Sequence, residues 1–180
     1  NLKGVRAVQE LMPGLPQVGV FDTAFHQTMP KEAYMYAVPY ELYEKYGVRR
    51  YGFHGTSHRY VSQRVCEFLN VKPEGKKIIT CHIGNGASIA AVKDGKCIDT
   101  SMGLTPLEGL VMGTRSGDID GGAITFIQKK LGLDADGMSN LLNKKSGMLG
   151  LTDISSDMRE IDSACKAGNE RAKLAIEMYN

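Results

Sequence analysis

A glycine-containing break between two short apolar segments constrains the fold of this chain more than any other feature. Residues 78–83 form a β-branched apolar run, and Gly84-Asn85-Gly86 follows directly. Residues 87–92 continue as a second apolar run, Asp94-Gly95 is a typical two-residue hairpin turn, and residues 96–101 lead back. This order predicts a strand, a glycine loop, a second strand, a hairpin and a third strand.

The loop between the first two predicted strands suits the binding of an anion. A residue without a Cβ tolerates positive φ and lets backbone N–H groups come close to a phosphate oxygen. Asn85-Gly86 taken alone favours an ordinary hairpin turn, and the loop matches neither the dinucleotide fingerprint nor the Gly-Lys-Ser/Thr phosphate loop. By itself, the loop is weak evidence for anion binding.

Composition excludes several classes of protein. The 180 residues carry a net charge of only +2, without a basic stripe, so we expect neither nucleic acid nor a membrane as partner. With no apolar run of about 18 residues and no signal-like start, we expect a soluble, cytoplasmic protein. Cys66, Cys81, Cys97 and Cys165 lack Cys-x-x-Cys spacing, so we interpret them as reduced core residues rather than metal ligands.

Upstream of the predicted strands, apolar spacing favours helices. It predicts a helix over residues 2–11, a short strand over residues 18–21 and two short helices within residues 30–46. Another helix should begin after a hydroxyl cap at Thr56 or Ser57 and bury one apolar face. That face would consist of Val61, Val65, Phe68 and Leu69.

Downstream, residues 102–117 are rich in glycine and follow no clear period, which predicts a long ordered loop. Helical patterns come after it. They cover residues 121–131, 135–144, 155–167 and 169–179. Because the chain starts at Asn1 and stops within a helical pattern, we expect a piece of a longer protein.

Three polar residues stand where a ligand can reach them. Asp22 follows the predicted strand, where it either points a carboxylate into a cleft or caps a turn. His54 lies at a helix N-terminus, which disfavours imidazolium and attracts anions, although a structural histidine is also expected there. His58, inside the helix, is the more structural of the two. Arg115 lies in the glycine-rich loop and suits phosphate or carboxylate binding, or is a surface arginine.

Taken together, five motifs resemble the acetate kinase, or acetokinase, family. They occur in the family's order and cover nearly the whole chain. The motifs are FDTAFHQTMP at 21–30, FHGTSH at 53–58, CHIGNG at 81–86, MGTRSGD at 112–118 and SSDMR at 155–159. The resemblance identifies the chain as similar to a middle segment of these enzymes.

The resemblance implies an α/β, ribonuclease-H-like fold of the acetate and sugar kinase, Hsp70 and actin superfamily. Such a domain has a mixed sheet with flanking helices, which this chain would contain only in part. Residues 1–24 would be the end of the N-terminal domain and the domain junction. Residues 25–180 would be the first part of the C-terminal nucleotide-binding domain, and the family's metal-associated residues would lie outside the chain.

The resemblance also assigns roles to residues. Asp22, His54 and Arg115 would be catalytic, with Asp22 as the active-site acid and the other two as stabilisers of the transition state. The nucleotide phosphates would meet a loop formed by His82, Ile83, Gly84, Asn85 and Gly86. The adenosine end would lie near Asp157, Met158 and Arg159.

The implied reaction is reversible, in-line phosphoryl transfer with Mg²⁺, in which ATP and acetate give ADP and acetyl phosphate. This chemistry needs positioning and charge neutralisation more than covalent help. A homodimer is expected from the family, and this chain alone is expected to be inactive. The alternatives are a propionate or butyrate kinase, or a noncatalytic nucleotide-binding module of the actin or Hsp70 kind, which would not need His54 or Arg115.

Overall fold

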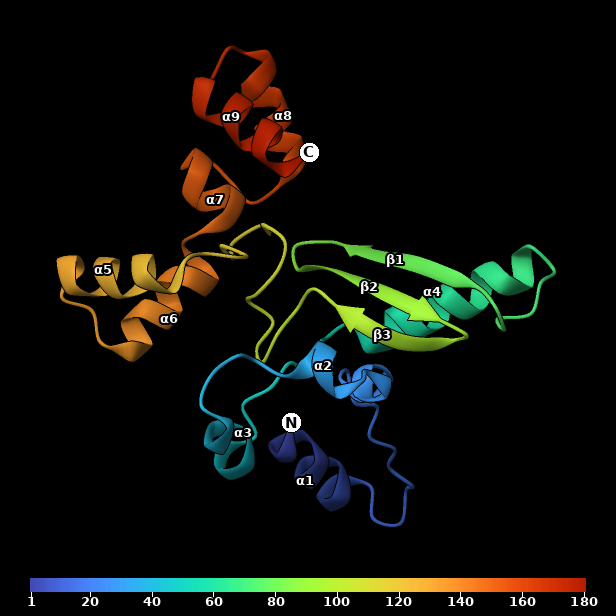
Figure 1. Ribbon diagram of the computed structural model, residues 1–180. Coiled ribbons are helices and arrows are strands. Elements are labelled where there is room, and N and C mark those ends of the chain that lie inside the picture. The colour runs from blue at the N-terminus through green and yellow to red at the C-terminus, as the bar shows by residue number, and fades with distance from the viewer.

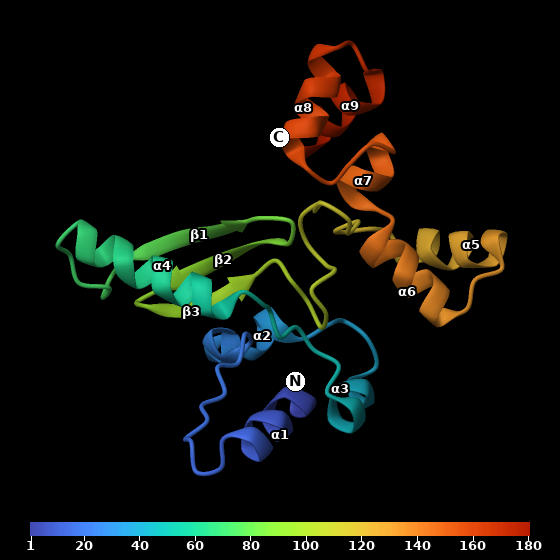
Figure 2. The same ribbon diagram turned by 180° about the vertical axis from the view of Figure 1, so that it is seen from behind.

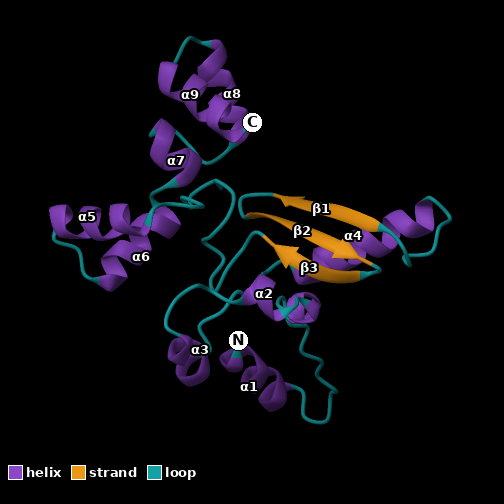
Figure 3. Ribbon diagram, in the orientation of Figure 1, coloured by secondary structure: helices purple, strands orange, loops and turns teal.

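The computed structural model describes residues 1–180 as a mixed α/β chain (Figures 1 and 3). Three strands form the centre, and helices lie on either side of them along the chain. The helical elements before the strands are α1 (Leu2–Leu11), the 3₁₀ helix η1 (Ala24–Thr28), α2 (Lys31–Tyr34), α3 (Tyr40–Tyr46) and α4 (Gly55–Phe68). Those after them are α5 (Gly121–Leu131), α6 (Ala135–Lys144), α7 (Gly147–Thr152), α8 (Met158–Lys166) and α9 (Glu170–Tyr179).

The predicted strand unit is confirmed. β1 (Lys77–Ile83), β2 (Ala87–Lys93) and β3 (Lys96–Thr100) form an antiparallel sheet in the order β1-β2-β3. The hairpin between β2 and β3 turns at Asp94 and Gly95, whose φ angles are 53° and 74°. Positive φ at both central residues gives the turn the twist of the flanking strands, which explains why an Asp-Gly pair stands there.

Helix α4 lies across one face of this sheet, in front of the strands in Figure 2. The prediction of its buried face was wrong, because Val61, Phe68 and Leu69 are exposed. The side chains that face the sheet are polar or small, at a helical spacing of four: His58, Ser62 and Cys66. Hydrogen bonds satisfy the two polar ones, so their burial does not leave a donor or acceptor without a partner.

The opposite face of β1 carries no covering helix. Ile79 and Ile83 are 74% and 57% exposed, and Cys81 between them is exposed too. Cys81 is therefore not the core residue that we predicted, whereas Cys66 and Cys97 are buried as free thiols. Alternation along the strand places these three residues on one side and Thr80 on the other.

Local predictions failed at two further places. Residues 18–21 form no strand, and Val18, Val20 and Phe21 are exposed, since no neighbouring strand supplies a ladder of hydrogen bonds. Helix α7 was missed because its glycine-rich sequence has no apolar period. The other predicted helices are present, although α8 begins three residues later than predicted because Asp157 caps it: its carboxylate accepts from the Arg159 N–H.

Buried apolar residues form three small clusters rather than one core. The first joins α7, α8 and α9 and contains Met148, Ile161, Ala172 and Ala175. The second and third lie along the sheet and contain Met29, Ala90 and Cys97, and Ala87, Met102 and Met112. Only 27 of 180 residues are buried, in agreement with an incomplete domain. No helix is both long and apolar enough to cross a membrane.

Candidate functional site

Asp22 and His54, two of the predicted catalytic residues, are directly linked. The backbone N–H of His54 donates to Oδ2 of Asp22 over 2.8 Å, and the N–H of Gly55 donates to the Asp22 carbonyl over 2.8 Å. Asp22 thus serves the start of α4 from another part of the chain, and the predicted hydroxyl caps at Thr56 and Ser57 were wrong. A Cβ at position 55 would lie 2.3 Å from the Asp22 carbonyl oxygen, so the junction requires glycine.

His54 holds an uncommon backbone conformation at this junction. Its φ is +56°, in the left-handed region where a residue with a Cβ costs roughly 1 kcal/mol or more. Its ring stacks on His82 with 4.0 Å between the centroids, and its Nδ1 lies 2.8 Å from Oγ of Ser88. Burial, followed by the neighbouring His82, lowers the pKa of His54. The neutral imidazole that we expected is therefore favoured, with burial as its main cause.

Arg115 reaches the same place from the glycine-rich loop. Its Nη1 donates to the carbonyl of Pro106 over 3.1 Å. A Cβ built on Gly86 would lie 3.1 Å from Nη1 of Arg115 and 3.4 Å from Nε2 of His54. Two cationic or hydrogen-bonding side chains therefore converge on one glycine of the predicted phosphate loop.

The glycine loop itself differs from the expectation in one respect. Neither Gly84 nor Gly86 has a positive φ, so backbone freedom is not what position 86 requires. It requires space, because a side chain there would fill the gap between His54 and Arg115. Asn85 fastens the loop to the glycine-rich loop, since its carbonyl accepts from the N–H of Gly113 over 3.0 Å.

A pocket beside the loop gathers the predicted nucleotide residues. Its volume is about 320 Å³, and its wall includes Gly84 and Asn85 from the loop and Asp157 and Met158 from the start of α8. Residues that were predicted from two distant parts of the sequence to bind the nucleotide thus line one pocket. A larger hollow of about 820 Å³ lies between the end of α4 and the β2–β3 hairpin, and none of the predicted site residues lines it.

The remaining predicted nucleotide residues do not line this pocket: they are His82, Ile83, Gly86 and Arg159. Nδ1 of His82 lies 2.9 Å from Oγ of Ser57, and Ile83 is exposed. Arg159 is exposed and forms an ion pair with Asp157, whose pKa it lowers to about 2. Asp157 is therefore ionised at neutral pH.

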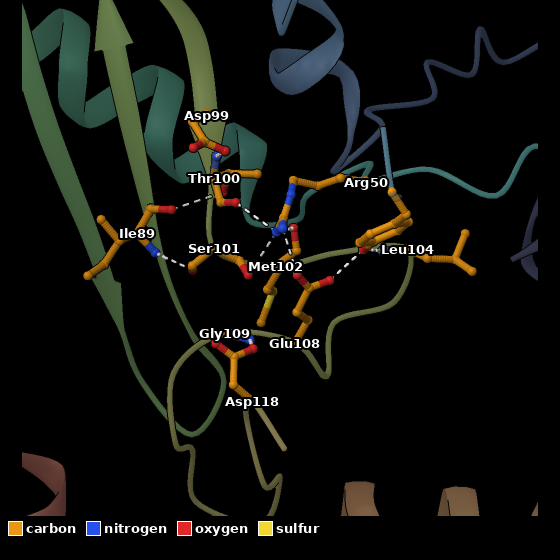
Figure 4. Close-up of polar contacts among 11 residues, drawn as sticks. Arg50, Ile89, Asp99, Thr100, Ser101, Met102, Leu104, Glu108, Gly109 and Asp118 are labelled. Carbon is orange, nitrogen blue, oxygen red and sulfur yellow. Dashed lines mark hydrogen bonds and ion pairs between the residues drawn. The ribbon is translucent and has the colours of Figure 1, made fainter. Parts of the chain in front are cut away.

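Sequence reasoning missed the residues that hold the glycine-rich loop in place. Arg50 donates through Nη1 to the carbonyls of Thr100, Ser101 and Met102, and its Nη2 lies 2.6 Å from Oε1 of Glu108 (Figure 4). The other oxygen of Glu108 accepts from the hydroxyl of Tyr36. No motif or period marks Arg50 or Glu108 in the sequence, because their partners lie about fifty residues or more away.

A second missed group lies behind His54. Oγ of Ser88 is 2.8 Å from Nδ1 of His54 and 2.8 Å from Nε2 of His58, and Nδ1 of His58 is 2.8 Å from Oγ1 of Thr80. The signal in the sequence was weak but present: Thr80 and Ser88 are polar residues at inward-facing positions of apolar strands. His58 is buried and fully hydrogen-bonded, which confirms its structural interpretation.

No group of three or more His, Cys, Asp or Glu side chains is arranged to hold a metal ion.

Comparisons with known proteins agree in family and in coverage. A sequence model described as the acetokinase family matches residues 1–180. The acetate kinase of Phocaeicola vulgatus is 78% identical over 179 residues, which are 99% of this chain and 45% of that protein. This chain thus spans about half the length of the curated relatives it matches.

Solved structures extend this agreement to the fold. The crystal structure of Porphyromonas gingivalis acetate kinase has a TM-score of 0.95 at 63% identity, over 99% of this chain and 45% of that one. A propionate kinase from Francisella tularensis has a TM-score of 0.94 at 52% identity, over 99% of this chain and 46% of that one. The superfamily fold expected from the motifs is therefore confirmed.

Proposed function

The chain belongs to the acetokinase family, and we propose that the protein transfers a phosphoryl group reversibly between ATP and acetate, with ADP and acetyl phosphate as the other pair. One observation carries this proposal beyond family membership. His54 and Arg115, from different parts of the chain, converge on Gly86, and the adjoining Gly84 and Asn85 line the pocket that also contains Asp157 and Met158.

Phosphoryl transfer explains why such an arrangement is useful. The transition state spreads negative charge over three oxygens of the transferring group, and a donor fixed in advance stabilises that charge without reorganisation. The Arg115 guanidinium supplies a full charge and a fork of N–H donors. His54 supplies one hydrogen bond, and the glycine at position 86 leaves room for the oxygens between them.

Asp22 has a different role in this proposal. Acetate is already a carboxylate and has no proton to lose, so no general base is needed. Asp22 keeps His54 and the start of α4 in place through its contacts with two backbone N–H groups, and its carboxylate adds negative charge beside the site. We propose that this charge helps to place the magnesium-bound nucleotide.

A second acceptor class has a specific observation in its favour. The propionate kinase from Francisella tularensis is nearly as similar in fold as the acetate kinase from Porphyromonas gingivalis. A propionate or butyrate kinase is therefore the alternative within the same chemistry. A noncatalytic nucleotide-binding module is disfavoured, because it would not need His54 and Arg115 at one glycine.

Further parts of the proposal come from the family resemblance. They are the division of the chain at residue 24 into domain junction and nucleotide-binding domain, a cytoplasmic homodimer, and Mg²⁺ as the metal that accompanies ATP.

Turnover of the full-length protein tests the proposal. Acyl phosphate formation would be measured with ATP and Mg²⁺ against acetate, propionate and butyrate at equal concentrations. We expect the highest kcat/KM with acetate. A higher value with propionate would move the protein to the alternative, and no acyl phosphate with any of the three would refute the phosphotransferase itself.

A further inference from the structure

A chain of hydrogen bonds runs from the buried interior to the back of the His54 ring. It starts at Thr80 on β1, passes through His58 of α4 and Ser88 of β2, and ends at Nδ1 of His54. All three links measure 2.8 Å, and Thr80, His58 and Ser88 are 3%, 1% and 0% exposed. Water therefore does not substitute for any member of this chain.

This series of hydrogen bonds restricts which ring nitrogens of His54 and His58 can carry a hydrogen. Burial, followed by the charge of the neighbouring His26, lowers the pKa of His58 to about 4, so its ring is neutral at pH 7. A neutral imidazole donates through one nitrogen and accepts through the other. The single hydroxyl hydrogen of Ser88 can point to only one of its two imidazole partners. Consequently the tautomer of His54 depends on that of His58.

Two arrangements satisfy all three short links and also give the buried Ser88 hydrogen an acceptor, whereas a third, in which Ser88 accepts from both rings, leaves that hydrogen without a partner. In the first, Thr80 donates to His58, His58 donates to Ser88, and Ser88 donates to Nδ1 of His54, which leaves the ring hydrogen on Nε2. In the second, every direction is reversed and Nε2 of His54 has no hydrogen. The second arrangement gains only the contact of Thr80 with the carbonyl of Ala90, at 3.5 Å, which is too long for a strong bond.

We propose that Ser88, His58 and Thr80 are positioning residues that hold the His54 ring with its hydrogen on Nε2, so that a neutral imidazole donates to an oxygen of the transferring phosphoryl group. Nε2 is the nitrogen that faces Gly86 and the Arg115 guanidinium. An anionic oxygen between these groups needs a donor from each. This inference rests on the proposed function, because only the phosphoryl oxygen requires the donor at Nε2.

A matched pair at the far end of the chain gives the sharpest test. Thr80→Val keeps the size of the side chain and removes its hydroxyl, whereas Thr80→Ser keeps the hydroxyl. Thr80 does not contact His54, so an effect on turnover must pass through His58 and Ser88. In the full-length enzyme we expect Thr80→Val to lower kcat several-fold and Thr80→Ser to keep a kcat close to the wild-type value. The KM for ATP should stay within about twofold of the wild-type value in both variants.

Ser88→Ala breaks the chain next to His54 and should lower kcat by about tenfold, the usual consequence of losing one buried hydrogen bond. Thermal melting of each variant separates loss of folded protein from loss of turnover. If both Thr80→Val and Ser88→Ala keep the wild-type kcat per folded molecule, the inference is wrong while the phosphotransferase stands.

A spectroscopic measurement reports the tautomer without any turnover. Nitrogen NMR of histidine-labelled full-length protein, recorded with and without inorganic phosphate, distinguishes a ring nitrogen that carries a hydrogen from one that does not. We expect hydrogens on Nε2 of both His54 and His58 when phosphate is present, and a mixture at His54 in Ser88→Ala. Hydrogens on Nδ1 of both rings in the phosphate-bound protein would overturn the inference, even if the protein proved to have another activity.

Discussion

The backbone N–H of His54 donates to the Asp22 carboxylate across 2.8 Å, which joins two residues 32 positions apart in the sequence. From the sequence we considered two roles for Asp22, as a cap and as an acid in a cleft. The structure shows that the Asp22 carboxylate accepts a hydrogen bond from the backbone at the start of α4, as the side chain of a helix cap does, although α4 begins far along the chain. A catalytic role and a structural one therefore have to be separated by experiment rather than by position.

Replacing Asp22 by asparagine and by alanine separates them. The amide oxygen introduced by Asp22→Asn still accepts from the His54 N–H, whereas Asp22→Ala removes this cap of α4, at a cost of about 0.5–2 kcal/mol. We expect Asp22→Asn to have a denaturant midpoint close to that of the wild type and a lower kcat, because the negative charge of the carboxylate is gone. If Asp22→Asn has wild-type kcat, the carboxylate serves only the backbone.

Arg115→Ala in the full-length enzyme should lower kcat far more than it raises KM for ATP. The reason is that a guanidinium next to Gly86 interacts with more negative charge on the transferring group in the transition state than in the ground state. Such arginines contribute roughly 10³-fold or more to kcat. Steady-state kinetics measures both constants. Arg64→Ala is the control, since Arg64 forms an exposed pair with Glu67 on α4 and should keep its activity. An unchanged kcat in Arg115→Ala would remove Arg115 from the mechanism.

The sheet was predictable because its signals are local. Alternation, the Asp-Gly turn and the glycine break all lie within residues 78–101, and each one constrains its immediate neighbours. The buried face of α4 was not predictable in this way. It is polar, and His58 and Ser62 become acceptable in the interior only through partners that the fold supplies, so an apolar period pointed to the wrong side of the helix.

The site was predictable in its members but not in its construction. The motifs named Asp22, His54 and Arg115, and the structure brings the last two to Gly86. Nothing in the sequence marked Arg50 or Glu108, because a residue that supports another far along the chain leaves no period or spacing behind, and Ser88 was marked only weakly, as a polar residue at an inward-facing position of an apolar strand. Whether the named residues act in catalysis stays a prediction.

Glu108→Gln tests the support of the glycine-rich loop. Glu108 faces Arg50 in a pair whose side chains are 33% and 18% exposed, and Pro106, two residues earlier, holds the Arg115 side chain. Losing the charge should lower the free energy of unfolding by about 1–2 kcal/mol and reduce kcat, as Arg115 becomes less fixed. Denaturant titration and kinetics measure the two effects. Glu67→Gln, in the exposed pair with Arg64, should change neither, and equal effects in both variants would contradict this role.

Acid should destabilise the protein through His58. Its pKa is lowered from 6.5 to about 4 in the folded state, chiefly by burial, so the unfolded chain binds a proton between these values and the folded one does not. The stability that His58 contributes is therefore complete above pH 6.5 and is lost as the pH falls towards 4. Urea midpoints of the full-length protein should fall between neutral pH and pH 4. His58→Gln should fall less steeply, and the same slope in both proteins would assign the effect to other groups.

Residues 1–180 expressed alone should show no acetate kinase turnover and should self-associate. The three separate clusters of buried residues do not cover the sheet, and several large apolar side chains stay in water, among them Phe21, Ile79 and Phe126 at 73%, 74% and 62% exposure. Exposed apolar surface of this kind favours association. The curated relatives have more than half of their length outside the matched region, and phosphoryl transfer needs a closed site that excludes water and holds donor and acceptor in line.

Three measurements on this polypeptide check that expectation. Acetyl phosphate formation with ATP, Mg²⁺ and acetate should stay at background, calorimetric titration with ATP should give weak binding or none, and light scattering should report a mass that rises with concentration. The full-length protein is the control for all three. The absence of turnover above background would have a physical reason. His54 and Arg115 form one wall of the proposed site, and a wall without its opposing side cannot exclude water from the transferring group. Turnover close to that of the full-length enzyme would mean instead that the residues around Gly86 form a complete site by themselves.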